Sequence, residues 1–310
     1  MVSGTRIAEE LETSRSEVWR AVQQLRELGV QIKGHPATGY QLNAMPDLLL
    51  PEILGPLLQG NLIGSRIRHY FAIGSTNTQA MTAGASGEPE GSVFVAEEQT
   101  AGRGRADHCW ESEASVGIYC SVLLRPPLSP ADALPLTLLA GLSVAEAVQQ
   151  VTGLRPDLRW PNDVLLNHKK FCGILTEMNS EATRVRYVVI GIGINVNHTS
   201  FAGELAPIAT SLRIESAREW SRVELTAALL KSLDKAYRKL IADPAEARAA
   251  ICRDFERQSS FARGRHVRIE EEPDFEGVSE GLDEHGFLRM RTASGPRTVL
   301  SGTVRATDGT

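Results

Sequence analysis

The spacing of apolar residues changes twice along this chain of 310 residues, and each change predicts a new domain. Up to residue 43 a helical spacing is followed by a short hairpin pattern. From residue 61 to 260 apolar strands and long helices follow in irregular order, which is typical of a mixed sheet and not of a βαβ array. After residue 262 short strands with glycine turns predict a small β-barrel. We therefore expect an α+β multidomain chain with domains at residues 1–43, 61–260 and 262–310.

Charge and composition exclude several classes of protein. The net charge of −5 argues against a surface built wholly for nucleic acid, although a local basic face remains compatible with it. The four cysteines form no CxxC pair and no zinc-type spacing with histidine, so we expect reduced thiols, a cytoplasmic location and no structural metal. The most apolar long window, residues 134–148, is interrupted by polar residues, so no membrane span is expected.

The first domain carries signals for a winged helix-turn-helix. Ser14 and Glu17 form a capping box ahead of a helix expected over residues 15–28, and Gly29 stands at its C-cap. A hairpin is expected over residues 30–42. Because arginine and glutamine read base edges, the helix face opposite the apolar stripe is a candidate DNA-binding surface. Its residues are Arg15, Ser16, Trp19, Arg20 and Gln23.

Two features count against a working DNA-binding module. Winged helix domains normally bury a further helix ahead of this pair, and only residues 1–5 precede it here, so we expect the first helix to be missing and the domain to be truncated or vestigial. Five basic and five acidic side chains up to Lys33 cancel, so no net positive field assists contact with phosphates. The alternative is an ordinary solvated helix face.

Glycine and arginine alternate in residues 99–105, QTAGRGR, between two expected strands. Gly102 and Gly104 allow close approach of the backbone to a ligand. Arg103 and Arg105 carry permanent charges suited to carboxylate or phosphate. Taken alone, the pattern more often belongs to a solvated surface loop. The neighbouring motifs therefore decide its meaning.

Three further motifs accompany this loop in one order. Residues 74–77, GSTN, stand where a strand enters a helix, and residues 159–163 read RWPND. Residues 170–175 read KFCGIL and are followed by residues 191–197, GIGINVN. This last stretch lacks the third glycine of a dinucleotide fingerprint, and no GxxxxGK[ST], GxSxG or HExxH motif is present. Hydrolytic triads and P-loop chemistry therefore have no support.

The ordered motifs resemble those of the bifunctional biotin protein ligases that also repress the biotin operon, over nearly the whole chain. The resemblance implies a winged helix-turn-helix, a central sheet domain of the class II synthetase type and an SH3-like barrel. It implies that biotin and Mg-ATP form biotinyl-5'-AMP, from which biotin passes to a lysine of the biotin carboxyl carrier protein of acetyl-CoA carboxylase. It further implies operator DNA as a partner and a homodimer on adenylate binding.

The resemblance also implies roles for individual residues. Lys170 would bridge the biotin carboxylate and the α-phosphate, and Arg103 and Arg105 would close the loop over both, which makes these three the catalytic candidates. Expected contacts to biotin or biotinyl-AMP are Ser75, Thr76, Asn77, Gln99, Gly102, Arg103, Gly104, Arg105, Trp110, Lys170 and Gly173. Expected on the ATP side are Arg159, Asn162, Asp163 and Asn195. Arg159 replaces the lysine usual in the family, and Trp160 is assigned to the core.

Two other functions remain open at this point. A lipoate ligase or octanoyltransferase would share the central fold, although the GRGR loop and residues 74–77 favour biotin. A transcription factor that uses the central domain only as a ligand sensor would be expected to lack Lys170, which is present.

Overall fold

A computed structural model describes residues 1–27, 30–35, 38–44, 47–105, 108–270 and 273–307. Leu28 and Gly29, at the expected end of the first long helix, and Pro36 and Ala37 of the expected hairpin lie outside the described residues. The chain divides into two compact units, Met1–Leu48 and Leu49–Thr310, which are described separately.

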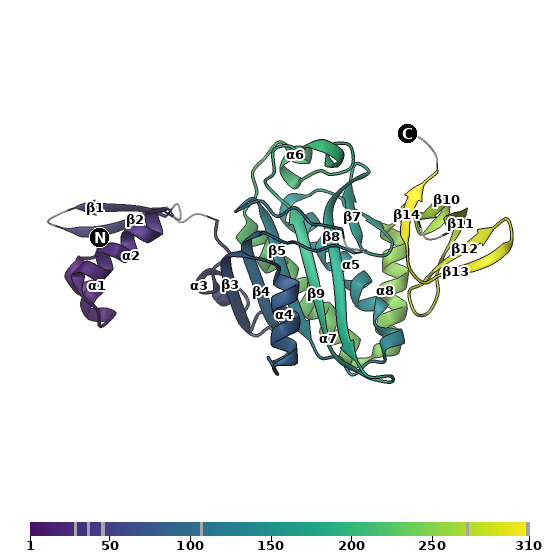
Figure 1. Ribbon diagram of the computed structural model, residues 1–310, viewed down its shortest axis with the longest axis horizontal. Coiled ribbons are helices and arrows are strands. Elements are labelled where there is room, and N and C mark those ends of the chain that lie inside the picture. The colour runs from purple at the N-terminus through teal and green to yellow at the C-terminus, as the bar shows by residue number, and fades with distance from the viewer. Residues whose placement is uncertain (28–29, 36–37, 45–46, 106–107, 271–272, 308–310) are drawn as a thin grey trace. The chain divides into compact units, whose positions relative to one another are not determined.

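The first unit contains two helices followed by an antiparallel hairpin (Figure 1). Its elements are α1 (Gly4–Glu10), α2 (Arg15–Glu27), β1 (Gln31–His35) and β2 (Gly39–Ala44). The predicted capping box is confirmed, because the Glu17 N–H donates to Ser14 Oγ and the Glu17 carboxylate accepts from the Ser14 N–H. A pair of helices ahead of a hairpin is the arrangement expected of a helix-turn-helix with a wing.

The core of the first unit is small. Val18 and Val22 of α2 are buried with Ala8 of α1, so the predicted apolar stripe does find cover. Leu11 and Leu25 behave differently, since 66% and 39% of their surfaces stay exposed. Apolar cover is therefore complete for the two valines and incomplete for the two leucines.

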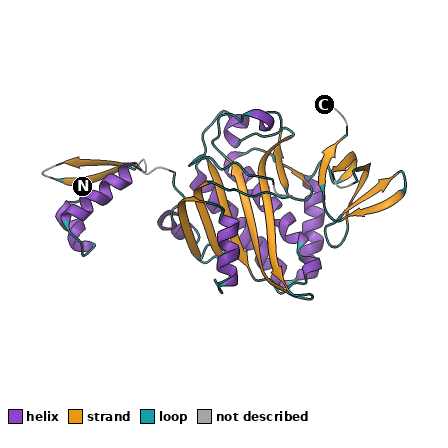
Figure 2. Cartoon of the chain, viewed as in Figure 1, coloured by secondary structure: helices purple, strands orange, loops and turns teal. Residues whose placement is uncertain are grey.

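A seven-stranded mixed sheet forms the centre of the second unit (Figure 2), as predicted. Its strand order is β3-β4-β5-β9-β8-β7-β6, with β3 and β4 parallel and every other neighbouring pair antiparallel. The strands are β3 (Arg66–Ile73), β4 (Ser92–Gln99), β5 (Gly117–Leu124), β6 (Asp157–Arg159), β7 (Asp163–Leu166), β8 (Lys169–Ser180) and β9 (Val185–Asn195).

Helices cover both faces of this sheet (Figure 1). Phe94 packs beneath α4, whereas its neighbours Val93 and Val95 enter the larger core beneath α5 and α7, because successive side chains of a strand point to opposite faces. The helices are α3 (Pro51–Leu57), α4 (Thr76–Ala85), α5 (Leu134–Thr152), α6 (Leu212–Ser216), α7 (Arg222–Ala242) and α8 (Pro244–Gln258). The segment Pro130–Thr152 is long and apolar enough to cross a membrane, but 72% of its most apolar window is buried inside the protein, as in a core helix.

A five-stranded antiparallel sheet of order β13-β12-β11-β10-β14 forms the predicted small C-terminal domain. Its strands are β10 (Arg263–Glu270), β11 (Phe275–Leu282), β12 (Leu288–Thr292), β13 (Gly295–Val299) and β14 (Thr303–Ala306). The spacing of apolar residues does not predict β14. Of the four residues of this strand Val304 alone is buried, so no alternation can be recognised. Trp160 links this domain to the central sheet, since its buried Nε1 donates to the Gly286 carbonyl at 2.9 Å, which confirms its core assignment.

Candidate functional site

The predicted motifs converge on one pocket of the central sheet, with about 460 Å³ of space that is partly open to solvent. The predicted residues that line it are Ser75, Thr76, Asn77, Gln99, Arg103, Gly104, Arg105, Trp110, Asn162, Lys170 and Gly173. Five further lining residues belong to the motifs at residues 170–175 and 191–197 but had no assigned role: Ile174, Leu175, Gly191, Ile192 and Gly193. Tyr119 and Cys120 also line the pocket and belong to none of the predicted motifs. Three segments far apart in sequence, around residues 75, 104 and 170, therefore share a single cavity.

One end of the pocket is a connected set of neutral polar side chains. Gln99 Oε1 accepts from the N–H and the hydroxyl of Thr76, at 2.9 and 3.1 Å. Gln99 Nε2 donates to Ser112 Oγ at 2.9 Å. Ser121 Oγ lies 2.8 Å from Thr76 Oγ1 and 2.6 Å from Asn77 Oδ1. Amides and hydroxyls that orient one another in this way suit a ligand with polar but uncharged groups. Ser112 and Ser121 belong to no recognisable motif, which is why sequence reasoning missed them.

The helix α4 begins at this neutral end. Ser75 is its N-cap, and the side chain accepts from the Thr78 N–H at 3.5 Å. Ser75, Thr76 and Asn77 are each less than a tenth exposed, so these three residues of the GSTN motif form part of the pocket wall, whereas Gly74 is exposed.

Glycines of β8 and β9 let bulky groups lie directly on the sheet. A Cβ on Gly191 would lie 2.1 Å from Asn77 Oδ1, and one on Gly193 would lie 2.5 Å from Trp110 Nε1. A Cβ on Gly173 would lie 2.8 Å from the Trp110 ring. Trp110 therefore walls the pocket, and its buried Nε1 has no hydrogen-bond partner within the described part of the chain. The two motifs are glycine-rich because their neighbours leave no room for side chains.

Lys170, which lines the pocket from β8, belongs to a chain of charges that includes the buried Asp163 and Arg159. Lys170 Nζ lies 2.6 Å from Asp163 Oδ1, and Arg159 Nη2 lies 2.7 Å from Asp163 Oδ2. Burial by itself would raise the pKa of Asp163, but the charges of Lys170 and Arg159 outweigh it and hold that pKa below its usual value. Asp163 is therefore an ionised carboxylate whose two oxygens each serve one cation.

The residues expected on the ATP side divide into two groups. Asn162 lines the pocket, and its Nδ2 donates to the Ile174 carbonyl at 3.0 Å. Arg159, Asp163 and Asn195 are buried and are not among the lining residues. A contact of these three with ATP stays a prediction.

A segment after β9 fixes the backbone of Lys170. The Lys170 N–H donates to the Ile208 carbonyl at 2.8 Å, and the Thr210 N–H donates to the Lys170 carbonyl at 2.9 Å. Asn195 Nδ2 in turn donates to the Thr210 carbonyl at 3.1 Å. Asn195 thus supports the segment that holds Lys170 in place.

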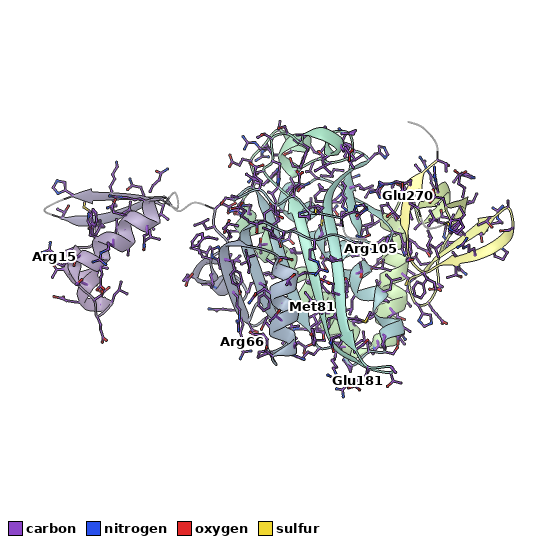
Figure 3. All side chains as sticks on the ribbon, in the orientation of Figure 1. Arg15, Arg66, Met81, Arg105, Glu181 and Glu270 are labelled. Carbon is purple, nitrogen blue, oxygen red and sulfur yellow. The ribbon has the colours of Figure 1, made fainter. Side chains whose placement is uncertain are left out.

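Both loop arginines already have acceptors within the protein. Arg103 Nη2 lies 3.0 Å from Glu177 Oε1. Arg105 Nη1 donates to Asn162 Oδ1 at 3.1 Å and to the Gly302 carbonyl at 3.3 Å, so the loop touches the C-terminal domain. Figure 3 labels Arg105 on the side of the central sheet nearest that domain. Gly102 is buried where a Cβ would lie 2.3 Å from the Trp110 carbonyl, which explains the glycine. The loop residues Ala106 and Asp107 lie outside the described residues.

The candidate DNA-binding residues lie on α2. Arg15, labelled in Figure 3, is exposed together with Ser16 and Arg20, and 56% of the Trp19 surface is exposed. Gln23 is half-buried, and its Oε1 lies 3.4 Å from Arg26 Nη1. The assignment of these residues to DNA stays a prediction.

The chain matches models of three protein families. The Biotin/lipoate A/B protein ligase family matches residues 72–195, the HTH domain residues 1–41, and the Biotin protein ligase C terminal domain residues 263–305. The bifunctional ligase/repressor BirA of Bacillus spizizenii is 34% identical over 306 residues, which are 98% of this chain and 93% of the relative. The chain belongs to the biotin protein ligase family.

Other biotin protein ligases match most of the chain. The biotin–[acetyl-CoA-carboxylase] ligase of Mycobacterium tuberculosis is 35% identical over 82% of this chain and 95% of that protein. The structure of the biotin protein ligase from Aquifex aeolicus in complex with biotin and ATP superposes with a TM-score of 0.65 at 30% identity. It covers 77% of this chain and 97% of its own. The three matched family ranges lie within the three domains expected from the sequence, in the same order.

Proposed function

We propose that this chain is a biotin ligase that forms biotinyl-5'-AMP from biotin and Mg-ATP and then biotinylates a lysine of the biotin carboxyl carrier protein of acetyl-CoA carboxylase. The observation that carries the proposal is a single pocket with a neutral, hydrogen-bonded end at Gln99 and a cationic end at Lys170. Biotin has the matching pair of ends, a neutral ureido ring and a carboxylate. The names of the relatives, and the biotin and ATP bound to the Aquifex aeolicus protein, support it.

In the first step a carboxylate oxygen of biotin attacks the α-phosphorus, and the bond to the leaving pyrophosphate breaks. Two anions must meet, so a fixed cation between them lowers the barrier most. We assign that role to Lys170, whose ammonium group is held 2.6 Å from the buried Asp163 carboxylate. Mg²⁺ is expected on the phosphates of ATP, since both oxygens of Asp163 are paired and the described residues contain no cluster of three His, Cys, Asp or Glu side chains.

The loop is expected to close by an exchange of acceptors. Arg103 and Arg105 would leave Glu177, Asn162 and the Gly302 carbonyl for the carboxylate and phosphate oxygens. Water that would hydrolyse the mixed anhydride is then kept out. In the second step the amine of the carrier lysine attacks the acyl carbon, AMP leaves, and the amine loses its proton.

We further propose that the first unit makes the chain a repressor of biotin operon DNA through the exposed face of α2. The HTH match and the named repressor relatives support this role. Homodimerisation on adenylate binding would use the edge strands β3 or β6, because an unpaired edge can add strands across a two-fold axis. Sedimentation that shows no change of mass with biotin and ATP would contradict the dimer. The reaction needs ATP and the carrier protein, and we expect it in the cytoplasm.

The deciding experiment incubates the full chain with biotin, Mg-ATP and apo carrier domain, and the carrier is then weighed by mass spectrometry. An ATP-dependent gain of one biotinyl group is the expected result. A parallel sample contains lipoate in place of biotin, because the matched family includes lipoate ligases. A lipoyl gain without a biotinyl gain would overturn the assignment of substrate.

A further inference from the structure

One carboxylate joins the neutral end of the pocket to the glycine-arginine loop. Glu177 lies on β8, and its Oε2 accepts from Asn77 Nδ2 at 2.9 Å. The same oxygen accepts from Arg103 Nη1 at 3.2 Å, while Oε1 lies 3.0 Å from Arg103 Nη2. Arg103 therefore contacts both oxygens of Glu177. This two-pronged geometry makes arginine–carboxylate pairs strong and directional.

The amide of Asn77 is held from every side. Its Nδ2 also donates to the Leu175 carbonyl at 3.2 Å, and its Oδ1 lies 2.6 Å from Ser121 Oγ. These contacts use both ends of the side chain, so the direction of the amide depends on Glu177 and Ser121. Any ligand that packs against Asn77 meets an amide whose orientation the protein has already set.

The ion pair between Arg103 and Glu177 is more exposed to solvent than the Asn77 amide. The Arg103 side chain is 48% exposed and that of Glu177 23%, so water screens their attraction and the pair adds little to global stability. Its effect is local, because the loop backbone near Arg103 is also tied by one bridge to Cys109 and by the hydrogen bond from the Trp110 N–H to the Gly102 carbonyl. Removal of the pair therefore frees the Arg103 side chain and loosens the loop locally, without unfolding the sheet.

We propose that Glu177 is a positioning residue that couples the biotin end of the pocket to the loop: it orients the Asn77 amide and holds Arg103 beside the pocket until an anionic ligand replaces it. The proposal rests on the proposed function for the identity of the ligand. The coupling itself is a property of the ligand-free chain. It also predicts a cost of closure, since a carboxylate or phosphate must compete with Glu177 for Arg103.

The test uses the isosteric variant Glu177→Gln, with Glu181→Gln as its matched control. Glu181 pairs with Arg186 at 2.8 Å on the outer surface, and Figure 3 labels it at the end of the β8–β9 hairpin away from Arg105. In the absence of ligand, hydrogen–deuterium exchange of residues 99–105 should become roughly tenfold faster in Glu177→Gln. The difference from the unsubstituted protein should shrink in 1 M salt, because screening already weakens the pair there. Glu181→Gln should leave this exchange unchanged.

The kinetic arm separates positioning from catalysis. Glu177→Gln should raise the KM for biotin several-fold, because the Asn77 amide is held less firmly, while kcat for adenylation changes less than about twofold. The release of biotinyl-AMP should not become faster, because Arg103 has already left Glu177 in that complex. Unchanged exchange and unchanged KM would overturn the proposal, and so would a large loss of kcat at constant KM. If the unsubstituted chain makes no biotinyl-AMP, the proposed function fails, whereas the exchange arm still decides the role of Glu177.

Discussion

Asp163 and Lys170 form an ion pair of 2.6 Å in which the carboxylate is 9% exposed and the ammonium 31%. The ammonium therefore reaches the pocket while its counter-ion remains buried. Arg159 occupies the other oxygen of Asp163, so the carboxylate balances two cations and one net positive charge is left for the ligand. A cation whose position is set before the substrates arrive needs no reorganisation during the reaction.

Lys170→Ala should slow biotinyl-AMP formation by about 100-fold or more, while the Kd for biotin rises far less. The lost charge matters most when carboxylate and phosphate meet. Pyrophosphate exchange measures the first quantity and calorimetry the second. Lys169→Ala, at the neighbouring half-buried position, is the control and should keep full activity. Equal losses of rate and affinity would indicate instead a general defect of the pocket.

Arg159→Met should destabilise the fold by about 3 kcal/mol, because it leaves the buried Asp163 with one cation in place of two. The pKa of Asp163 should rise, since burial then meets less opposition. Arg159→Lys, which restores the charge without the fork, should recover most of the loss. Urea unfolding at pH 7 measures each free energy, and equal stability of Arg159→Met and the unsubstituted chain would refute a structural role for the pair.

Gly193→Ala should weaken biotin binding and lower stability by about 1–3 kcal/mol, because the new methyl group would lie 2.5 Å from Trp110 Nε1 and displace the ring. Gly141→Ala in α5 is the control, since its Cβ would have ordinary contacts beyond 3.5 Å and should favour the helix. Thermal unfolding and biotin titration distinguish the two variants. An unchanged affinity for biotin and an unchanged unfolding temperature in Gly193→Ala would contradict the packing argument.

His198 should make stability depend on pH. Burial lowers its pKa to about 4 from the usual 6.5, and its ring stacks on Phe201 at 5.3 Å. Between these two pKa values His198 is protonated in the unfolded chain but neutral in the folded chain. The free energy of unfolding is therefore highest above pH 6.5 and falls as the pH drops toward 4. The loss should reach about 3 kcal/mol. Urea unfolding from pH 4 to 8 measures it, and His198→Gln should flatten this part of the profile.

Arg20→Ala should weaken binding to operator DNA if α2 is the reading helix. A lost phosphate contact lowers the affinity for all sequences alike and reduces the slope of log K against log salt by about one. A lost base contact costs about 1–3 kcal/mol at one position of the site. Fluorescence anisotropy at several salt concentrations separates these cases. Arg66→Ala, at an exposed position of the second unit labelled in Figure 3, is the control.

The elements that sequence reasoning predicted well are those with a strong local signal. The capping box at Ser14, the apolar run of α5 and the Gly-Arg loop each depend on residue types within a few positions of one another. Their physical causes are equally local. Unpaired amides at the start of a helix favour the capping box, the spacing of apolar side chains favours α5, and the backbone angles open to glycine favour the loop. The order of the motifs then indicated the family and the position of Lys170.

The contacts that organise the pocket have no such local cause. Ser121 reaches Thr76 across 45 positions of the chain, Glu177 reaches Asn77 across 100, and Arg105 reaches the Gly302 carbonyl across 197. The sequence around a serine or glutamate in a strand does not indicate which distant residue it will contact in the folded protein. The residue types, their periodicity and the motif order are enough to indicate the domains, the family and the lysine proposed as catalytic. The partners of each charge were decided by the sheet, because strand pairing and helix packing alone set which distant side chains come within hydrogen-bond distance.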